Sequence, residues 1–118
     1  MKYYEFELEG ETIKLRLTSN DCMEIEKKSG IKLLDYIQDY SIQTIVTLLM
    51  YMRRSSIPNY SLKEASELYD KLIDSEQFGS MEKIIYDVIL EGLVVSGFLK
   101  KEELTQIKGN KNDKENKN

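Results

Sequence analysis

Hydrophobic and polar residues alternate over residues 3–18, with the period of two that is typical of β-strands. A Gly10-Glu11 turn divides this stretch, since glycine accepts the positive φ that the first central position of a type II′ turn requires. Apolar positions then pair on one face and opposite charges pair on the other, an arrangement that stabilises two neighbouring strands. The expected pairs are Leu8 with Ile13, Phe6 with Leu15, Tyr4 with Leu17, Glu7 with Lys14 and Glu5 with Arg16. We therefore expect a β-hairpin whose apolar face packs on the rest of the chain and whose free edges offer a route to strand addition.

After residue 18 the apolar positions recur at the spacing of helices. Thr18 with Asp21 and Ser61 with Glu64 match the capping-box pattern, and Ser41 is a typical N-cap residue. Helices are expected at 18–30, 31–39, 42–54, 62–74 and 81–96, followed by a weaker helical turn that ends near residue 107. The expected fold class is α+β and predominantly α-helical, with the N-terminal hairpin packed on a bundle of about four to six helices.

A chain of 118 residues can bury one core, so residues 2–107 are expected to form a single helical domain that begins with the hairpin (3–18). The Lys/Asn-rich tail, 108–118, is expected to be disordered because its last ten residues include no apolar side chain. Two helical stretches, 45–52 and 88–95, are apolar on more faces than one core normally demands. Each is either a central helix of the bundle or a helix that presents an apolar face to a partner.

The chain contains no histidine and no tryptophan, and Cys22 is its single cysteine. Imidazole is the usual general base near neutral pH and the commonest metal ligand, so most zinc and nucleophile–base sites cannot be assembled from these residues. The acidic residues around Cys22 disfavour a thiolate and favour a packing role for this side chain. The glycines are too scattered to form a phosphate-binding loop. We therefore expect no enzyme activity, no catalytic residue, no metal and no cofactor.

The formal net charge of −4 makes the chain a poor ligand for phosphate backbones, because non-specific affinity for nucleic acid comes from Lys and Arg. The apolar stretches are shorter than the ~20 residues that cross a bilayer, and no signal peptide is visible at the charged N-terminus. A lone cysteine agrees with a reducing cytoplasm. Neither nucleic acid nor a membrane is therefore expected as a partner.

Tyrosine combines a large contact area with a hydroxyl group and is enriched at protein interfaces. Among the eight tyrosines, Tyr4 and Tyr69 are expected in the core. Four others flank the arginine pair at 53–54, which is expected near a helix C-terminus, where it stabilises the helix dipole. The predicted partner-binding residues are Tyr36, Tyr40, Tyr51, Arg53, Arg54 and Tyr60.

Four stretches of the chain carry a family resemblance: KYYEFELEGETIKLRLTSNDCMEIEKKSG, LLDYIQDYSIQTIVTLLMYMRRSS, ASELYDKLID and DVILEGLVVSGFLKKEEL. Over residues 2–107 the chain resembles the tail assembly chaperones of long-tailed (siphovirus-type) phages and prophages of low-GC Gram-positive bacteria. The resemblance implies a non-enzymatic, mostly helical protein with an N-terminal hairpin. Such a protein binds the tape measure protein and the tail tube protein during tail morphogenesis in the bacterial host cytoplasm, and it is absent from the mature virion.

Members of this family are often made in two lengths by a programmed ribosomal frameshift. The resemblance therefore adds a frameshifted longer form of this chain, and further copies in a homo-oligomer, to the expected partners. It transfers no individual site residue. The alternative function is a small DNA-binding regulator encoded by a phage or mobile element, in which short helices and the arginine pair imitate a helix-turn-helix. The acidic body disfavours this alternative.

Overall fold

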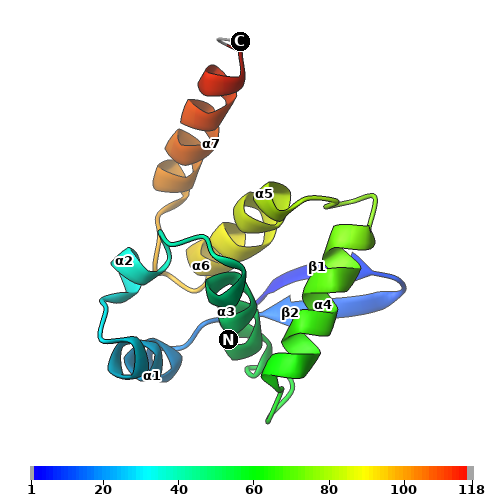
Figure 1. Ribbon diagram of the computed structural model, residues 1–118, viewed down its shortest axis with the longest axis vertical. Coiled ribbons are helices and arrows are strands. Elements are labelled where there is room, and N and C mark those ends of the chain that lie inside the picture. The colour runs from blue at the N-terminus through cyan, green and yellow to red at the C-terminus, as the bar shows by residue number, and fades with distance from the viewer. Residues whose placement is uncertain (1, 117–118) are drawn as a thin grey trace.

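The computed structural model describes residues 2–116, with side chains described as far as Gly109. An antiparallel hairpin packs against helices that surround α3, as Figure 1 shows. The α+β, predominantly helical fold class is confirmed. The elements are β1 (Tyr4–Leu8), β2 (Glu11–Leu15), α1 (Ser19–Ser29), α2 (Leu33–Tyr36), α3 (Ile42–Arg53), α4 (Leu62–Asp74), α5 (Met81–Ile84), η1 (Ile85–Ile89), α6 (Leu90–Val95) and α7 (Lys101–Asn116).

The hairpin forms, but the expected register is wrong by two residues. The central turn residues are Glu9 and Gly10, with φ of 51° and 79°, and not Gly10 and Glu11. Two positive φ values define a type I′ turn, whose twist matches that of the flanking strands. The observed pairs are Tyr4 with Leu15, Glu5 with Lys14, Phe6 with Ile13, Glu7 with Thr12 and Leu8 with Glu11. A slip by two residues leaves every side chain on its expected face, which explains why the apolar face is still buried.

The expected helix caps are confirmed. Thr18 and Asp21 exchange both bonds of a capping box at the start of α1, and Ser61 with Glu64 does the same at the start of α4. The Ser41 hydroxyl accepts a hydrogen bond from the backbone N–H of Thr44 at the start of α3. These bonds satisfy N–H groups that the first turn of a helix leaves without a partner.

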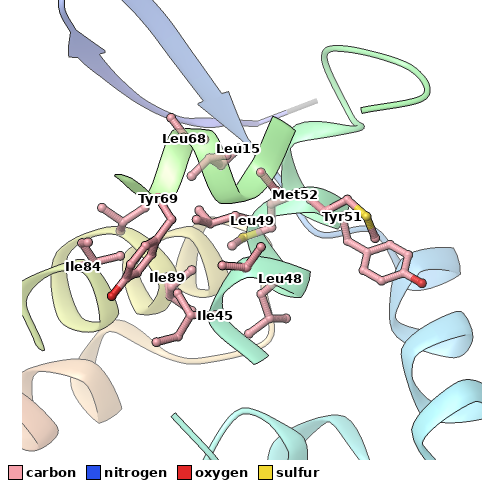
Figure 2. Packing of buried hydrophobic residues seen from close by; sticks show 14 of the residues in the cluster. Leu15, Ile45, Leu48, Leu49, Tyr51, Met52, Leu68, Tyr69, Ile84 and Ile89 are labelled. Atoms are coloured by element: carbon pink, nitrogen blue, oxygen red, sulfur yellow. The ribbon is translucent and has the colours of Figure 1, made fainter. Parts of the chain in front are cut away.

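Helix α3 is the central helix of the molecule. Nine of its residues, from Thr44 to Arg53, are buried, and α3 packs on α4, β2 and η1. Figure 2 shows its apolar side chains meeting Leu15 from the hairpin, Tyr69 from α4 and Ile89 from η1. Of the two interpretations of the apolar stretch 45–52, the structure therefore supports a central helix.

The helix expected over 81–96 forms with an irregular middle. A π-helical segment, η1, lies between α5 and α6. At Gly92 in α6, an added Cβ would lie 3.0 Å from Sδ of Met52 in α3. This distance is shorter than ordinary van der Waals contact, so an added Cβ would require the Met52 side chain to shift.

The backbone of α7 continues through residues that were expected to be disordered. Its helix runs to Asn116 and projects from the body of the molecule in Figure 1, while residues 117 and 118 lie outside the described part of the chain. The first turns dock through buried Leu104, and Nζ of Lys108 lies 2.9 Å from Oε1 of Glu91 and 3.3 Å from Oδ1 of Asp87. A docked first turn supplies the costly nucleus, after which each added residue extends the helix at lower cost.

Candidate functional site

Large apolar side chains are exposed around the first two helices. Met23 in α1 is 62% exposed, Leu34 in α2 is 54% exposed, and Ile31 in the connection between these helices is 46% exposed. A single exposed apolar residue is ordinary on a protein surface, but a group beside a groove marks a candidate binding site.

A groove of about 630 Å³ lies at this end of the molecule. We call it the α1–α2 groove. It is lined by Cys22, Glu26, Lys32, Leu33, Leu34, Asp35, Gly97 and Phe98. Its lining combines apolar side chains with charged side chains of both signs, a combination that suits the side chains of another protein.

Local backbone geometry builds the groove. Helix α1 ends at Gly30, whose φ of 73° lies in the left-handed region that favours glycine and turns the chain toward α2. A carboxylate oxygen of Glu26 accepts a hydrogen bond of 2.9 Å from the backbone N–H of Leu33, which ties α2 to α1. Leu33 is 3% exposed and anchors the short helix, so its neighbour Leu34 must point elsewhere and lies exposed. The opposite wall begins at Gly97, with φ of 88°, where the chain leaves α6.

The thiol of Cys22, which lines the groove, is not activated as a nucleophile. Burial and then the nearby Glu26 carboxylate raise the pKa of Cys22. A raised pKa keeps the thiol protonated near neutral pH, and the thiol is a much weaker nucleophile than the thiolate. Cys22 therefore contributes contact area to the groove, in agreement with the packing role expected from its acidic neighbours.

The six predicted partner-binding residues do not form one surface. Tyr51, Arg53 and Tyr60 are buried, at 3%, 4% and 8% exposed, and so have little area to offer a partner. Tyr40 is exposed and Tyr36 is half-buried.

The arginine pair lies at the end of α3, as expected, but is engaged within the protein. Nη2 of Arg53 lies 3.0 Å from Oε1 of Glu11, and Nε of Arg54 donates a 2.9 Å hydrogen bond to the backbone carbonyl of Tyr60. Both guanidinium groups also lie over tyrosine rings, at 5.8 Å from Tyr60 and 5.3 Å from Tyr51. These contacts leave the pair poorly placed to bind phosphate groups.

Two smaller pockets are lined in part by four of the predicted partner-binding residues. Tyr36 and Tyr51 line a pocket of about 350 Å³ between α1 and α3, and the pKa of Tyr51 is raised by burial and by the Glu24 carboxylate. Arg53 and Tyr60 line another of about 240 Å³ beside the hairpin. Both pockets are bordered largely by polar and charged side chains, so the α1–α2 groove is the better apolar binding site.

Sequence reasoning missed the residues that make the groove. Leu33 and Leu34 lie side by side in the sequence, within the helix expected over 31–39. Adjacent residues on a helix point in directions about 100° apart, so a single turn that buries Leu33 can leave Leu34 exposed. The sequence did not say which of the two leucines, if either, would be exposed.

Comparisons of the chain with known proteins found no match. No family model, no curated protein and no solved structure matches the chain. Among residues 2–109, whose side chains are described, no group of three or more Asp, Glu, Cys or His side chains could hold a metal ion, and within residues 2–116 no helix is long and apolar enough to span a bilayer. The candidate site is therefore characterised by its own geometry alone, as a groove with a largely apolar lining.

Proposed function

We propose that this protein is a phage tail assembly chaperone that binds the tape measure protein and the tail tube protein through its α1–α2 groove, without catalysis. The observation that carries the proposal is the apolar groove bordered by exposed Leu34 and half-buried Phe98. The resemblance of residues 2–107 to this chaperone family supplies the identity of the partners. The proposed location is the bacterial host cytoplasm, and a frameshifted longer form of the chain is a further proposed partner.

A protein that keeps others soluble during assembly needs apolar area that is exposed before the partner arrives. Leu34 provides such area on a helix tied to α1 by the Glu26 hydrogen bond. Met23 adds a flexible thioether, a side chain that adapts to partners of different shape. None of these features requires a reactive group.

The test is a pull-down with the purified tail tube protein and tape measure protein from the same gene cluster. The wild-type chain is expected to retain at least one of them. Leu34→Glu places a charge in the apolar contact and should reduce retention at least tenfold, since desolvating a carboxylate without a partner is costly.

Leu62→Glu is the matched control. Leu62 is 48% exposed, close to the 54% of Leu34, and it also lies in the first turn of a helix. Leu62 does not line the groove, so its substitution should leave binding unchanged. Failure of the wild-type chain to retain either tail protein would contradict the proposal, and equal losses in the two variants would contradict the assignment to the groove.

The alternative function, DNA binding, finds no support in these contacts. Arg53 is buried against Glu11, and Arg54 donates to the backbone of Tyr60. A gel-shift measurement at low salt is expected to show no binding of duplex DNA, because phosphate affinity requires exposed cations.

A further inference from the structure

The two outer edges of the hairpin differ in the hydrogen bonds that they receive from the rest of the protein. In a hairpin closed by a two-residue turn, the closing pair Leu8 and Glu11 is hydrogen-bonded, and bonded pairs then alternate along the ladder. The N–H and C=O groups of Glu5 and Glu7 in β1, and those of Thr12 and Lys14 in β2, therefore point away from the partner strand.

The outer edge of β2 is covered. Just beyond the strand, the backbone N–H of Arg16 donates a 3.0 Å hydrogen bond to the carbonyl of Met52 at the end of α3. The hydroxyl of Ser56 donates at 3.3 Å to the carbonyl of Lys14. These contacts come from the end of α3 and the turn that follows it, and they occupy the edge of β2 at Lys14 and Arg16, where a further strand would have to displace them.

Helix α6 contacts β1, but among the described residues no such hydrogen bonds reach the outer edge of this strand. No backbone hydrogen bond in the described part of the chain reaches the outward N–H and C=O groups of Glu5 and Glu7. Glu5 and Glu7 are exposed on the outer face of the hairpin. Phe6 and Leu8, which alternate with them along the strand, are buried on the inner face. An unpaired strand edge is a template for another strand.

Strand β2, which pairs with the opposite edge of β1, shows which residue types suit a neighbouring strand. Strand β2 faces β1 with Lys14 opposite Glu5, Nζ to Oε1 at 3.9 Å, and with Ile13 opposite Phe6 on the buried face. A strand on the free side meets the same acidic outer face and the same apolar inner face. Alternating basic and apolar residues would complement both.

We propose that the free edge of β1 accepts an extended segment of another protein in which basic and apolar residues alternate, as a third strand of the sheet. A second copy of this chain is disfavoured as the occupant. Its β1 would set Glu5 and Glu7 near like charges, and its β2 is covered by α3. This surface is distinct from the α1–α2 groove, so the two proposals fail or succeed independently.

The probe is a short, acetylated and amidated peptide of alternating lysine and valine, added to the full chain. We expect backbone amide shifts in NMR spectra centred on Glu5 and Glu7, and an affinity at least tenfold higher than that of the matching glutamate–valine peptide. Equal affinity for the two peptides would overturn the charge complementarity on which the choice of occupant rests.

A pair of variants separates strand addition from simple charge attraction. Glu7→Ala and Glu7→Pro both remove the carboxylate and its hydrogen bond with Thr12, but only proline removes the outward N–H. Proline is tolerated where the N–H of an edge strand faces solvent, so the fold should survive. The proline variant should bind the lysine–valine peptide about fivefold more weakly than the alanine variant, which is the effect of one hydrogen bond. Equal binding of the two variants would overturn the proposal.

A second measurement applies if Glu7→Pro unfolds the chain, as circular dichroism would show. N-methylation of either the lysines or the valines of the peptide blocks one of its two edges against the wild-type protein. One of the two methylated peptides should lose binding and the other should keep it. Equal affinities of both would show that no strand forms.

Discussion

Among the described residues, Arg53 is the charged side chain that the fold buries most completely. Its side chain is 5% exposed, whereas that of its partner Glu11 is 58% exposed, and its Nε has no hydrogen-bond partner. The Tyr60 ring and a 3.4 Å contact from Nη1 to the hydroxyl of Ser56 complete its surroundings. The two members of this ion pair therefore have unequal roles, because water can solvate only the glutamate.

Substitutions of the two partners should have unequal effects on the free energy of unfolding. Glu11→Ala leaves a buried guanidinium without its counter-charge and should destabilise the protein by about 2 kcal/mol. Arg53→Met keeps an apolar stem in the same place, removes the unpaired Nε and leaves Glu11 in water, so it should cost less than about 1 kcal/mol. Urea denaturation of both variants measures the difference. The reverse order of stability would contradict this account of the pair.

At the scale of elements, α3 and α6 meet at a point where a Cβ would crowd a buried side chain. Gly92 faces Met52, which is fully buried and packed on all sides. An added methyl group would enter the space that Sδ of Met52 occupies. The helical preference of alanine and the crowding at this contact act in opposite directions.

Gly92→Ala should lower the free energy of unfolding by about 1 kcal/mol, because the crowding exceeds the gain of about 1 kcal/mol in helix propensity. In a Met52→Ala background the same substitution should be stabilising, since the space is then open. A double-mutant cycle in urea measures the coupling. An identical effect in both backgrounds would show that the two residues do not limit the approach of these helices.

At the scale of the whole molecule, tyrosines from several elements share one electrostatic property. Burial raises the pKa of Tyr4, Tyr40, Tyr51, Tyr60 and Tyr69 above the ordinary value of 10.0. The hydroxyl of Tyr4 also donates a 2.6 Å hydrogen bond to the backbone carbonyl of Asp87, which ties the hairpin to η1. The folded protein therefore holds these phenols neutral at pH values where the unfolded chain ionises them.

The sign of the pH dependence follows from this difference. The contribution of these tyrosines to stability is fully present below pH about 10, and it is lost as the pH rises through their folded-state pKa values. Urea denaturation between about pH 8 and pH 11 should show the free energy of unfolding falling above about pH 10. Phenolate absorbance should likewise rise at higher pH in the folded chain than in urea, with no tryptophan to interfere.

Tyr4→Phe is the control for the alkaline transition. This substitution removes a hydroxyl whose pKa is raised, together with its hydrogen bond to the backbone carbonyl of Asp87. The variant should therefore be less stable at neutral pH, and its free energy of unfolding should fall less as the pH rises above about 10. An unchanged alkaline slope would show that Tyr4 does not take part.

Local features of the fold were predictable from the sequence. The capping boxes at Thr18 and Ser61, the N-cap at Ser41 and the faces of the hairpin depend on residues within a few positions of one another. The hairpin register was missed because two neighbouring turns around Gly10 leave the same side chains on the same faces. The periodic pattern could not separate these registers.

The sequence by itself determined the N-caps of α1, α3 and α4, which faces of the hairpin are apolar, and that no imidazole is present for catalysis or metal binding. Only the tertiary structure decided which apolar and charged side chains would be covered. Arg53 was buried by the hairpin, and Leu34 was left exposed when Leu33 was anchored against the core. The physical reason is that helix caps and strand faces arise from short-range bonds, whereas burial depends on contacts between segments far apart in the chain. The α1–α2 groove and the free edge of β1 both belong to this second group.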